Sequence, residues 1–308
     1  MSIVIYAKLV KISKITLYNF SLVKYNADIQ TTSALPNNQK GKNIMKKMFA
    51  MLLAVLMIMS CFAGCTKEEA KTIVVGYTIY APMNYFEEGS DKLVGFDTEL
   101  AEAVFGNLGY KVIFQEIDWN QRYTDLNSGA IDCVWNGFTC NCADEDDGIQ
   151  RAEKVDFSYN YMENRQVIVI KEGTNIATAA DLSGKQGAVE SGSAGAGYAK
   201  SFEGVNIKGC NYQTDCLMEV NAGSADFAVL DAQLAKSYCG KGDYANLKIV
   251  EELSSDVEFY AIGFKKGSSL TAKVNAELEK LAADGTIAKL AEKYGVSNTA
   301  ITDFSDQK

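Results

Sequence analysis

From residue 72 onward, short apolar strands alternate with amphipathic helices, and this alternation restricts the possible folds more than any other feature of the chain. The first series has strands at 72–76, 111–114 and 130–135, with helices beginning at Asp97 and near Gln121. The helix that Asp97 caps carries its apolar residues on one face, at Leu100, Ala101, Val104, Phe105 and Leu108. Strands and helices that take turns at this spacing predict an α/β fold with largely parallel sheets.

A second, similar series follows the first. A strand rich in β-branched residues is expected at 166–170, and further strands at 187–189, 226–231 and 259–264. A glycine-rich turn occupies 191–197, and two helices separated by Asp284-Gly285 end the fold. A chain of 308 residues is long enough to bury two separate cores, so two lobes are predicted.

Charge and histidine content exclude several classes of function. The formal net charge is −9, and the first 64 residues hold eight lysines and one acid, so the remainder carries −16. A surface this acidic repels phosphate backbones, which argues against nucleic-acid binding. The chain has no histidine, the commonest general base and metal ligand. Ser-His-Asp and Cys-His catalysis and His-ligated zinc are thereby excluded, while two-carboxylate chemistry or a lysine base stays open. We expect no catalytic residue, metal or cofactor.

The eight cysteines leave two interpretations open. Two of them precede residue 66, and the other six are Cys133, Cys140, Cys142, Cys210, Cys216 and Cys239. No CxxC pair occurs, which gives little support to a zinc ribbon or a thioredoxin motif. The six are either small buried hydrophobic residues or form one or two disulfides of an exported domain, with Cys210–Cys239 as the suggested pair.

The residues before the first strand have the order of an export signal. Met45-Lys46-Lys47 is followed by the 12 apolar residues 48–59, too few for the ~20 that span a bilayer, and then by Phe62-Ala63-Gly64-Cys65. Small residues before a cysteine resemble the lipobox of bacterial lipoproteins. We expect a signal peptide at 45–64, lipidation of Cys65, a linker at 65–71 and a misassigned upstream segment at 1–44.

Six motifs, taken in order, resemble the amino-acid-binding family of type II solute-binding proteins of ABC importers (bacterial extracellular solute-binding proteins, family 3). They are Leu93-Val94-Gly95-Phe96-Asp97, Ser128-Gly129-Ala130-Ile131-Asp132, Val155-Asp156-Phe157-Ser158, Asp181-Leu182-Ser183-Gly184-Lys185, Gly223-Ser224-Ala225-Asp226 with Asp231, and Asp284-Gly285-Thr286-Ile287 with Glu292-Lys293-Tyr294. The resemblance implies two lobes, each a mixed, mostly parallel sheet flanked by helices, joined by two crossing hinge strands. It places a first lobe at 72–165 plus 260–308 and a second at 170–255.

The resemblance also implies how the carboxylate of an amino acid is bound. The family's carboxylate-binding arginine matches Arg151, although the insertion at 140–148 leaves Arg122 and Arg165 as alternatives. Backbone N–H groups at Ser193 and Ala194, where a helix opens, are expected to add donors. The acidic loop at 144–148 is expected to be a solvated surface and not a metal site.

The other end of the ligand is assigned by the same resemblance. Asp231 is expected to pair with the ammonium group, or else to cap a helix. The remaining shell is expected from Asn136, Gly137 and Thr139, and the rings of Tyr80 and Trp119 are expected to flank the ligand side chain. Trp135 is expected to pack behind the site.

The function implied is that of a lipid-anchored, monomeric binding protein outside the membrane that passes a free amino acid to the permease of an ABC importer. Family members selective for basic ligands place an acid near the first strand, where Tyr77 and Thr78 stand here. A neutral or polar amino acid, cystine included, is therefore expected over a basic one. The alternative is a dehydratase of amino-acid precursors on the same fold.

Overall fold

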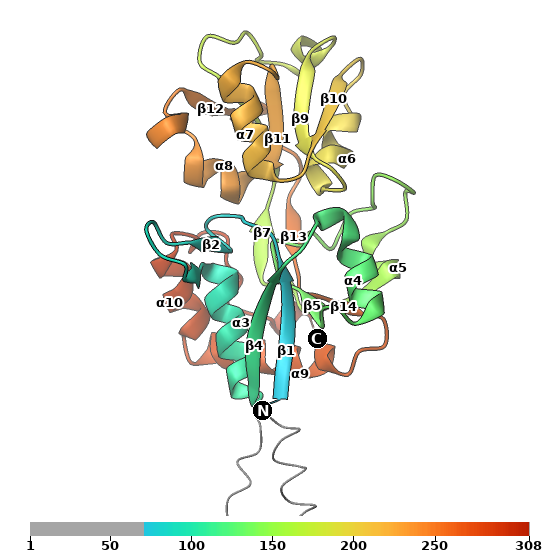
Figure 1. Cartoon of the computed structure of the whole chain (residues 1–308), viewed down its shortest axis with the longest axis vertical. Helices are drawn as coiled ribbons and strands as arrows, with labels where there is room; N and C mark the ends of the chain where they lie inside the picture. The colour runs from blue at the N-terminus through green and yellow to red at the C-terminus, as the bar shows by residue number, and fades with distance from the viewer. Residues whose placement is uncertain (1–70, 308) are drawn as a thin grey trace, which may run out of the picture. The chain divides into compact units, whose positions relative to one another are not determined.

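The computed structural model of the protein describes residues 71–307. The predicted upstream segment 1–44, the signal peptide 45–64 and the lipidated Cys65 lie outside the described residues. Within them, two five-stranded sheets are connected by a two-stranded ribbon (Figure 1). We call the part built on each of the two sheets a lobe.

The sheet of the first lobe has the strand order β4-β1-β5-β14-β6. Its strands are β4 (Tyr110–Glu116), β1 (Lys71–Tyr77), β5 (Cys133–Val134), β14 (Gly263–Lys265) and β6 (Val155–Phe157). β1 is parallel to β4 and β5, whereas β14 is antiparallel to β5 and β6. Four of its strands therefore point the same way and β14 runs against them.

The sheet of the second lobe repeats this plan with the order β10-β9-β11-β8-β12. Its strands are β10 (Asn206–Cys210), β9 (Gln186–Glu190), β11 (Phe227–Asp231), β8 (Gln166–Lys171) and β12 (Leu247–Val250). β9 is parallel to β10 and β11, and β8 is antiparallel to β11 and β12. β8 is therefore the one reversed strand of this sheet.

Two short strands cross between the lobes, and each leads into a reversed strand. β7 (Met162–Asn164) pairs antiparallel with β13 (Glu258–Tyr260), with Asn164 opposite Glu258. The chain passes from β7 into β8 and from β13 into β14. The predicted fold class, two mixed sheets flanked by helices and joined by two crossing strands, is thus confirmed. A ribbon of β2 (Tyr85–Phe86) and β3 (Leu93–Val94) completes the strands of the described region.

Helices cover both faces of the second sheet because its strands alternate their side chains. Val167 and Val169 of β8 pack in the core that α7 (Gln213–Ala222) and α8 (Ala232–Tyr238) share. Ile168 and Ile170 face the other way, into the core that α6 (Ala194–Lys200) closes. Residues 167–170 of β8 are all apolar, as expected of a strand buried on both faces.

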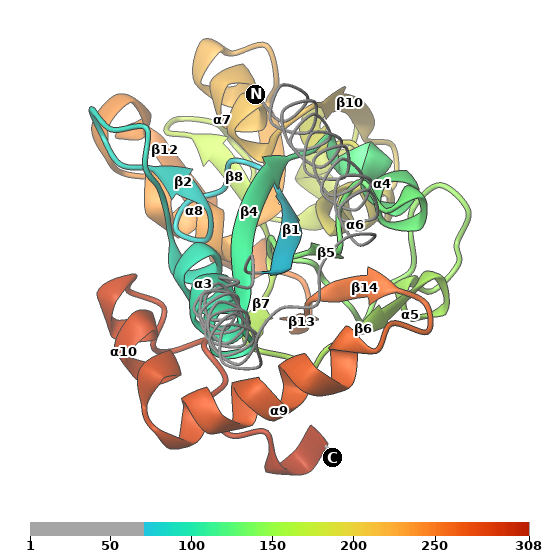
Figure 2. The same cartoon turned by 60° about the horizontal axis from the view of Figure 1, so that its bottom comes forward.

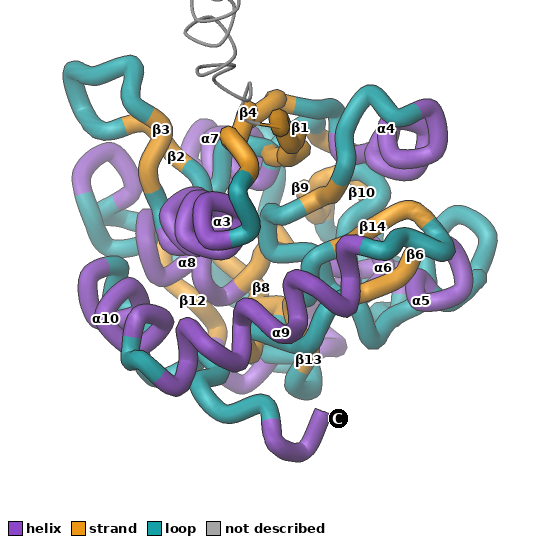
Figure 3. Tube along the Cα trace, turned by 90° about the horizontal axis from the view of Figure 1, so that it is seen from below, coloured by secondary structure: helices purple, strands orange, loops and turns teal. Residues whose placement is uncertain are grey.

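The first lobe follows the same rule. Ile73 and Val75 of β1 face α3 (Phe96–Asn107) and α9 (Leu270–Ala283), while α4 (Arg122–Ser128) packs on the opposite face. Views from below show α9 lying across this lobe, with α10 (Thr286–Lys293) after it (Figures 2 and 3). The short α5 (Arg151–Lys154) precedes β6. Among residues 71–307, no helix has both the length and the apolar character to cross a bilayer.

Short 3-10 turns fill several connections, at Trp119–Gln121, Ala179–Leu182, Gly242–Tyr244, Glu251–Leu253 and Ser305–Gln307. The helix expected from near Gln121 is confirmed as α4, which begins at Arg122 directly after the first of these turns. The strand expected at 259–264 is in fact two strands, because the chain leaves the hinge at Tyr260 and enters the first sheet at Gly263.

Asp97 does not cap α3, contrary to the prediction. Gly95 holds the N-cap position, and Asp97 lies one residue inside the helix. Its buried carboxylate accepts hydrogen bonds from the Gly137 N–H (3.0 Å) and the Tyr161 hydroxyl (2.9 Å). Burial raises the pKa of Asp97 to about 7, despite these two bonds. The residue thus supports the loop after β5 instead of the helix end.

The suggested Cys210–Cys239 disulfide is also wrong. All six cysteines of the described region are free thiols. Cys210 ends β10 and lies within hydrogen-bonding reach of Cys216, one helical turn inside α7. Trp135, in contrast, packs as expected: it is fully buried between Phe105 and Tyr161, with ring centroids 6.0 Å from each.

Candidate ligand-binding site

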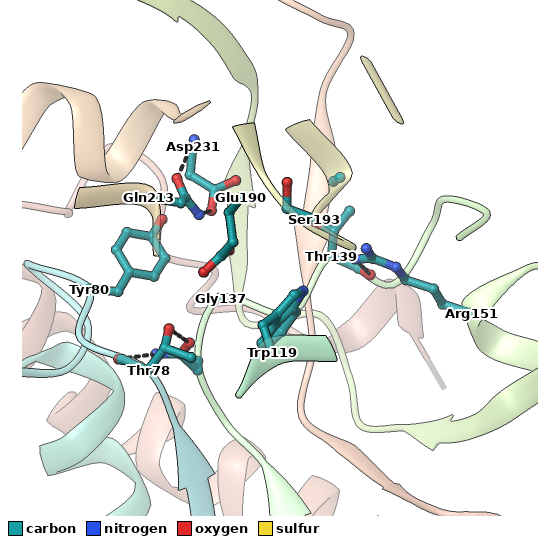
Figure 4. Close-up of a pocket in the computed structure, with 12 residues that line it drawn as sticks. Thr78, Tyr80, Trp119, Gly137, Thr139, Arg151, Glu190, Ser193, Gln213 and Asp231 are labelled. Atoms are coloured by element: carbon teal, nitrogen blue, oxygen red, sulfur yellow. Dashed lines mark hydrogen bonds between the residues drawn. The ribbon is translucent and has the colours of Figure 1, made fainter. Parts of the chain in front are cut away.

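A pocket lies where the two lobes face each other, close to the carboxyl ends of their parallel strands, the usual place for ligands in α/β sheets (Figure 4). The first lobe lines it with Thr78, Tyr80, Trp119, Asn136, Gly137, Thr139 and Arg151. The second lobe lines it with Glu190, Ser193, Ala194, Gln213 and Asp231. All nine residues that the sequence placed at a ligand are therefore brought together in one pocket.

Arg151 supplies the positive charge of the lining. Its side chain is 1% exposed. Nε donates to Asp144 Oδ1 (2.9 Å), Nη1 to the Thr139 carbonyl (3.1 Å) and Nη2 to the Gly192 carbonyl (3.0 Å). A guanidinium has five N–H donors, so two remain after these three bonds. Arg151 can therefore still donate to an anionic group that enters the pocket.

Asp144, in the insertion at 140–148, neutralises the positive charges beside the pocket. Its carboxylate accepts from Arg122 Nη2 (2.7 Å) and Lys154 Nζ (2.7 Å) as well as from Arg151. Burial alone would raise the pKa of Asp144, but the Lys154 bond and the surrounding cations hold that pKa at about 2. The prediction that this loop is a solvated surface is wrong for Asp144, whose side chain is 5% exposed.

The other two arginines do not line the pocket. Arg122 lies behind Trp119, where Nη1 donates to the Trp119 carbonyl (2.8 Å). Arg165 is exposed and donates to the Ser255 carbonyl (2.6 Å). Of the three candidates, Arg151 is the one that the structure puts at the pocket.

Asp231 stands on the opposite wall, held by three side-chain amides. Its carboxylate accepts from Asn164, Gln166 and Gln213. Although Asp231 occupies the N-cap position of α8, its side chain makes no capping bond. Burial raises the pKa of Asp231 above its usual range. The carboxylate is thus fixed toward the pocket instead of serving the helix end.

The hinge is bonded to the same wall. Glu258 of β13 accepts from Asn164 Nδ2 (2.6 Å), Gln166 Nε2 (2.8 Å) and Thr139 Oγ1 (2.9 Å). Burial and the nearby Asp231 carboxylate raise the pKa of Glu258 to about 7. Asn164 therefore bridges an acid of the pocket and an acid of the hinge.

Aromatic and small residues shape the remaining lining. The Tyr80 hydroxyl hydrogen-bonds that of Tyr260 (2.7 Å), and the Trp119 ring meets Phe138 edge-on with centroids 5.2 Å apart. Gly137 has a φ of 56°, and a Cβ there would lie 2.6 Å from the Tyr80 ring. The position therefore requires glycine for two reasons, its backbone conformation and the approach of that ring.

Below Tyr80, three polar side chains bond to one another. Thr78 Oγ1 donates to Asn136 Oδ1 (2.6 Å), and Asn136 Nδ2 donates to the Thr78 carbonyl (2.9 Å) and to Asn84 Oδ1 (2.7 Å). These bonds fix the loops after β1 and β5 to each other. They give the pocket a rigid polar floor.

Several bonds cross from one lobe to the other, so the structure is a closed form. The Gly192 carbonyl accepts from Trp119 Nε1 (3.2 Å) as well as from Arg151. The Gly192 N–H donates to Glu145 Oε1 (3.1 Å), and Glu145 Oε2 pairs with Lys200 Nζ of α6 (2.8 Å). The insertion thus places Asp144 behind the pocket, and its Glu145 bonds to the second lobe.

Three lining residues were not predicted: Thr78, Glu190 and Gln213. Thr78 and Glu190 sit at the ends of expected parallel strands, a position that could have identified both. Gln213 begins α7, a helix that was not predicted at all. The spacing of Cys216, Leu217 and Val220 on one helical face, with Asp215 in the first turn, was the available signal.

The described residues contain no group of three or more cysteines and carboxylates arranged to hold a metal ion. The lining consists of hydrogen-bonding groups, two aromatic rings, one arginine and two acids. Two lobes that share such a pocket across a hinge define a binding protein that closes around a small polar molecule.

Residues 73–297 match the model of the bacterial extracellular solute-binding proteins, family 3, and the chain belongs to this family. The match confirms the resemblance drawn from the motifs. The chain is 29% identical over 259 residues to the arginine-binding extracellular protein ArtP of Bacillus subtilis (strain 168), covering 81% of this chain and 98% of ArtP. It is 30% identical over 217 residues to the L-cystine-binding protein TcyA of the same strain, covering 70% and 77%.

Solved structures agree with the fold. An ancestral arginine-binding protein bound to arginine superimposes with a TM-score of 0.66 and 35% identity, covering 72% of this chain and 97% of that one. This likeness extends over both lobes and therefore over the pocket between them.

The Asp144 ion pairs generate a stability prediction. Asp144→Asn should lower the free energy of unfolding by about 3–5 kcal/mol, because it leaves buried Arg122 and Arg151 without their counter-charge. The pKa of Asp144, about 2, is below its ordinary 3.8, so its contribution is present above pH 3.8 and lost as the pH falls through about 2. Urea denaturation at pH 7 and at pH 2 to 4 measures both effects.

The matched control is Asp147→Asn, because Asp147 also pairs with Lys154 but is 44% exposed. It should change the free energy by less than about 0.5 kcal/mol. Equal effects of the two substitutions would show that Asp144 is not a buried counter-ion.

The Glu145 contacts generate a prediction about closure. Glu145→Gln should move the ligand-free protein toward an open form by up to about 5-fold in population, since a partly exposed ion pair contributes up to about 1 kcal/mol. Small-angle X-ray scattering would report this as a larger radius of gyration. Glu219→Gln is the control, because Glu219 pairs with Lys208 inside the second lobe. Identical scattering from both variants would contradict the assignment.

Proposed function

We propose that this protein binds a free amino acid outside the cytoplasmic membrane and delivers it to an ABC importer. The observation that carries the proposal is the placement of Arg151 and Asp231 on opposite walls of one pocket. A free amino acid carries a carboxylate and an ammonium group, and both need partners when water is excluded. The names of the relatives, which bind arginine and cystine, support this class of ligand.

The proposed contacts follow from the charges. The ligand carboxylate takes the free donors of Arg151 and the backbone N–H groups at Ser193 and Ala194, with Thr139 beside them. The ammonium group pairs with Asp231, and Gly137 and Asn136 complete that shell. Tyr80 and Trp119 flank the side chain of the ligand.

Ligand binding then shifts the population of the protein from an open form to the closed form. The first lobe (72–165 and 260–308 in this proposal) contributes Arg151, and the second lobe (170–255) contributes Asp231. Only the closed form makes both contacts, so the ligand stabilises it in proportion to its preference for that form. The permease subunits recognise the closed monomer and receive the ligand.

Anchoring belongs to the same proposal. The family is extracellular, and the apolar run followed by Cys65 is typical of a lipoprotein signal. Two acyl chains on Cys65 would hold the protein stably on the outer face of the cytoplasmic membrane, which is the periplasm in a Gram-negative cell.

This anchor is tested by mass spectrometry of the native protein from the membrane fraction. The expected N-terminal peptide begins at a diacylated Cys65. Peptides from residues 1–44 in cells would contradict the expected start at Met45.

A dehydratase is the alternative function. The pocket acids Glu190 and Asp231 are the groups that such an enzyme would use for proton transfer. Purified protein should nevertheless leave arogenate and prephenate unchanged while it binds amino acids. Turnover of either compound would favour the enzyme.

The binding site is tested by Asp231→Ala. Loss of the ammonium partner should weaken binding at least ~30-fold, since removing one partner of a buried ion pair costs about 2–5 kcal/mol. A thermal-shift screen of all amino acids identifies the ligand first, and calorimetry then measures its affinity.

Asp226→Asn serves as the control, because Asp226 lies at the surface beside Lys185. Circular dichroism establishes that each variant is folded. Unchanged affinity in folded Asp231→Ala would refute the role given to Asp231.

A further inference from the structure

Glu190 is an acid in the pocket to which the contacts above give no role. It ends β9 and is 5% exposed. In Figure 4 its carboxylate points from the second lobe toward the space between Tyr80 and Trp119. Those two rings are the ones proposed to flank the ligand side chain. Glu190 is therefore directed at the part of the ligand that distinguishes one amino acid from another.

No cation of the described residues forms an ion pair with Glu190. The positive charges of Arg122 and Arg151 lower the pKa of Glu190, but both arginines are themselves paired with Asp144. Gln213 hydrogen-bonds the Glu190 carboxylate but carries no charge. Asp231, the other neighbouring charged group, has the same sign. The lining thus contains two acids and one arginine, and that arginine already has a counter-ion.

The backbone groups of a bound amino acid do not offset the excess negative charge of the lining. Its carboxylate and its ammonium group add no net charge, and they use Arg151 and Asp231. Glu190 is left as a buried carboxylate without a cation, an arrangement that costs several kcal/mol when ionised. A second positive charge on the ligand would remove that cost.

We propose that the ligand is an amino acid with a cationic side chain, whose ammonium or guanidinium group pairs with Glu190 between Tyr80 and Trp119. The proposal rests on the amino-acid-binding function proposed above and specifies its substrate class. It departs from the expectation of a neutral or polar ligand, which considered only the end of the first strand at Tyr77 and Thr78. Here the selecting acid comes from the second lobe.

The proposal has a pH signature. Burial and the Asp231 charge raise the pKa of Glu190 to about 8 in the empty closed form, while Arg122, Gln213 and Arg151 oppose the rise. A bound cation lowers that pKa, so binding releases a proton below pH 8. The affinity for a cationic ligand should therefore increase from pH 6 to pH 8. Glu258, with a pKa of about 7, titrates in the same range, so the Glu190 contribution is taken as the difference between wild type and Glu190→Gln.

The test is calorimetry with L-arginine, L-lysine, L-citrulline, L-glutamine and L-cystine. Citrulline matches arginine in shape but carries no side-chain charge. Arginine or lysine should bind at least ~30-fold more tightly than citrulline, the effect of pairing one buried charge. Glu190→Gln should remove most of that difference and its pH dependence, while citrulline binding changes less than about 3-fold. Glu219→Gln, remote from the pocket, should bind every ligand as wild type does.

Each other outcome is decisive. Tighter binding of glutamine or cystine than of arginine and lysine would overturn the cationic ligand while leaving the proposed function intact. Equal weakening of all ligands by Glu190→Gln would make Glu190 a structural residue and also overturn it. Folded protein that binds no amino acid would refute the proposed function itself.

Discussion

Charge burial is the constraint on which the closed form depends. When the lobes meet, water leaves the space between them, and each charge there must have a partner. Asp144 meets this requirement for three cations at once. The Asp144 carboxylate balances the charge of Arg151, so this buried guanidinium stays ionised at the pocket and keeps two N–H donors unused. The insertion at 140–148, which carries Asp144, therefore supports the site and is more than an exposed surface loop.

The two acids on the opposite side of the pocket are stabilised by amides instead of by ion pairs. Asp231 and Glu258 are close and of like charge, and no cation pairs with either among the described residues. Amides of Asn164, Gln166 and Gln213 surround them instead. An amide donates a hydrogen bond to a carboxylate without cancelling its negative charge, so these acids still attract a cation. Asn164 and Glu258 lie opposite each other on the hinge strands, so this hydrogen-bonded network joins the pocket wall to the hinge.

The two lobes divide the work of recognition. The first lobe supplies both aromatic walls, the polar floor of Thr78 and Asn136, and the arginine. The second lobe supplies both acids that line the pocket. In our proposal, selectivity for a side-chain charge depends on the second lobe and operates only when the lobes close. A residue at the end of a strand, such as Glu190, is well suited to this role, because the sheet fixes its direction.

The sequence by itself predicted the two-lobe fold and nine of the twelve residues that line the pocket. Strand periodicity and strand-helix order are local, so they predicted the α/β class. The family resemblance predicted nine ligand-binding residues, Arg151 and Asp231 among them, and all nine line one pocket. The sequence could not show that Asp144 is buried, that Asp97 supports Gly137 or that Cys210 lies beside Cys216, because each depends on contacts between separate segments. It also missed α7 and with it Gln213. Only the tertiary structure decided which charges have partners, because pairing depends on distances in space that no spacing along the chain records.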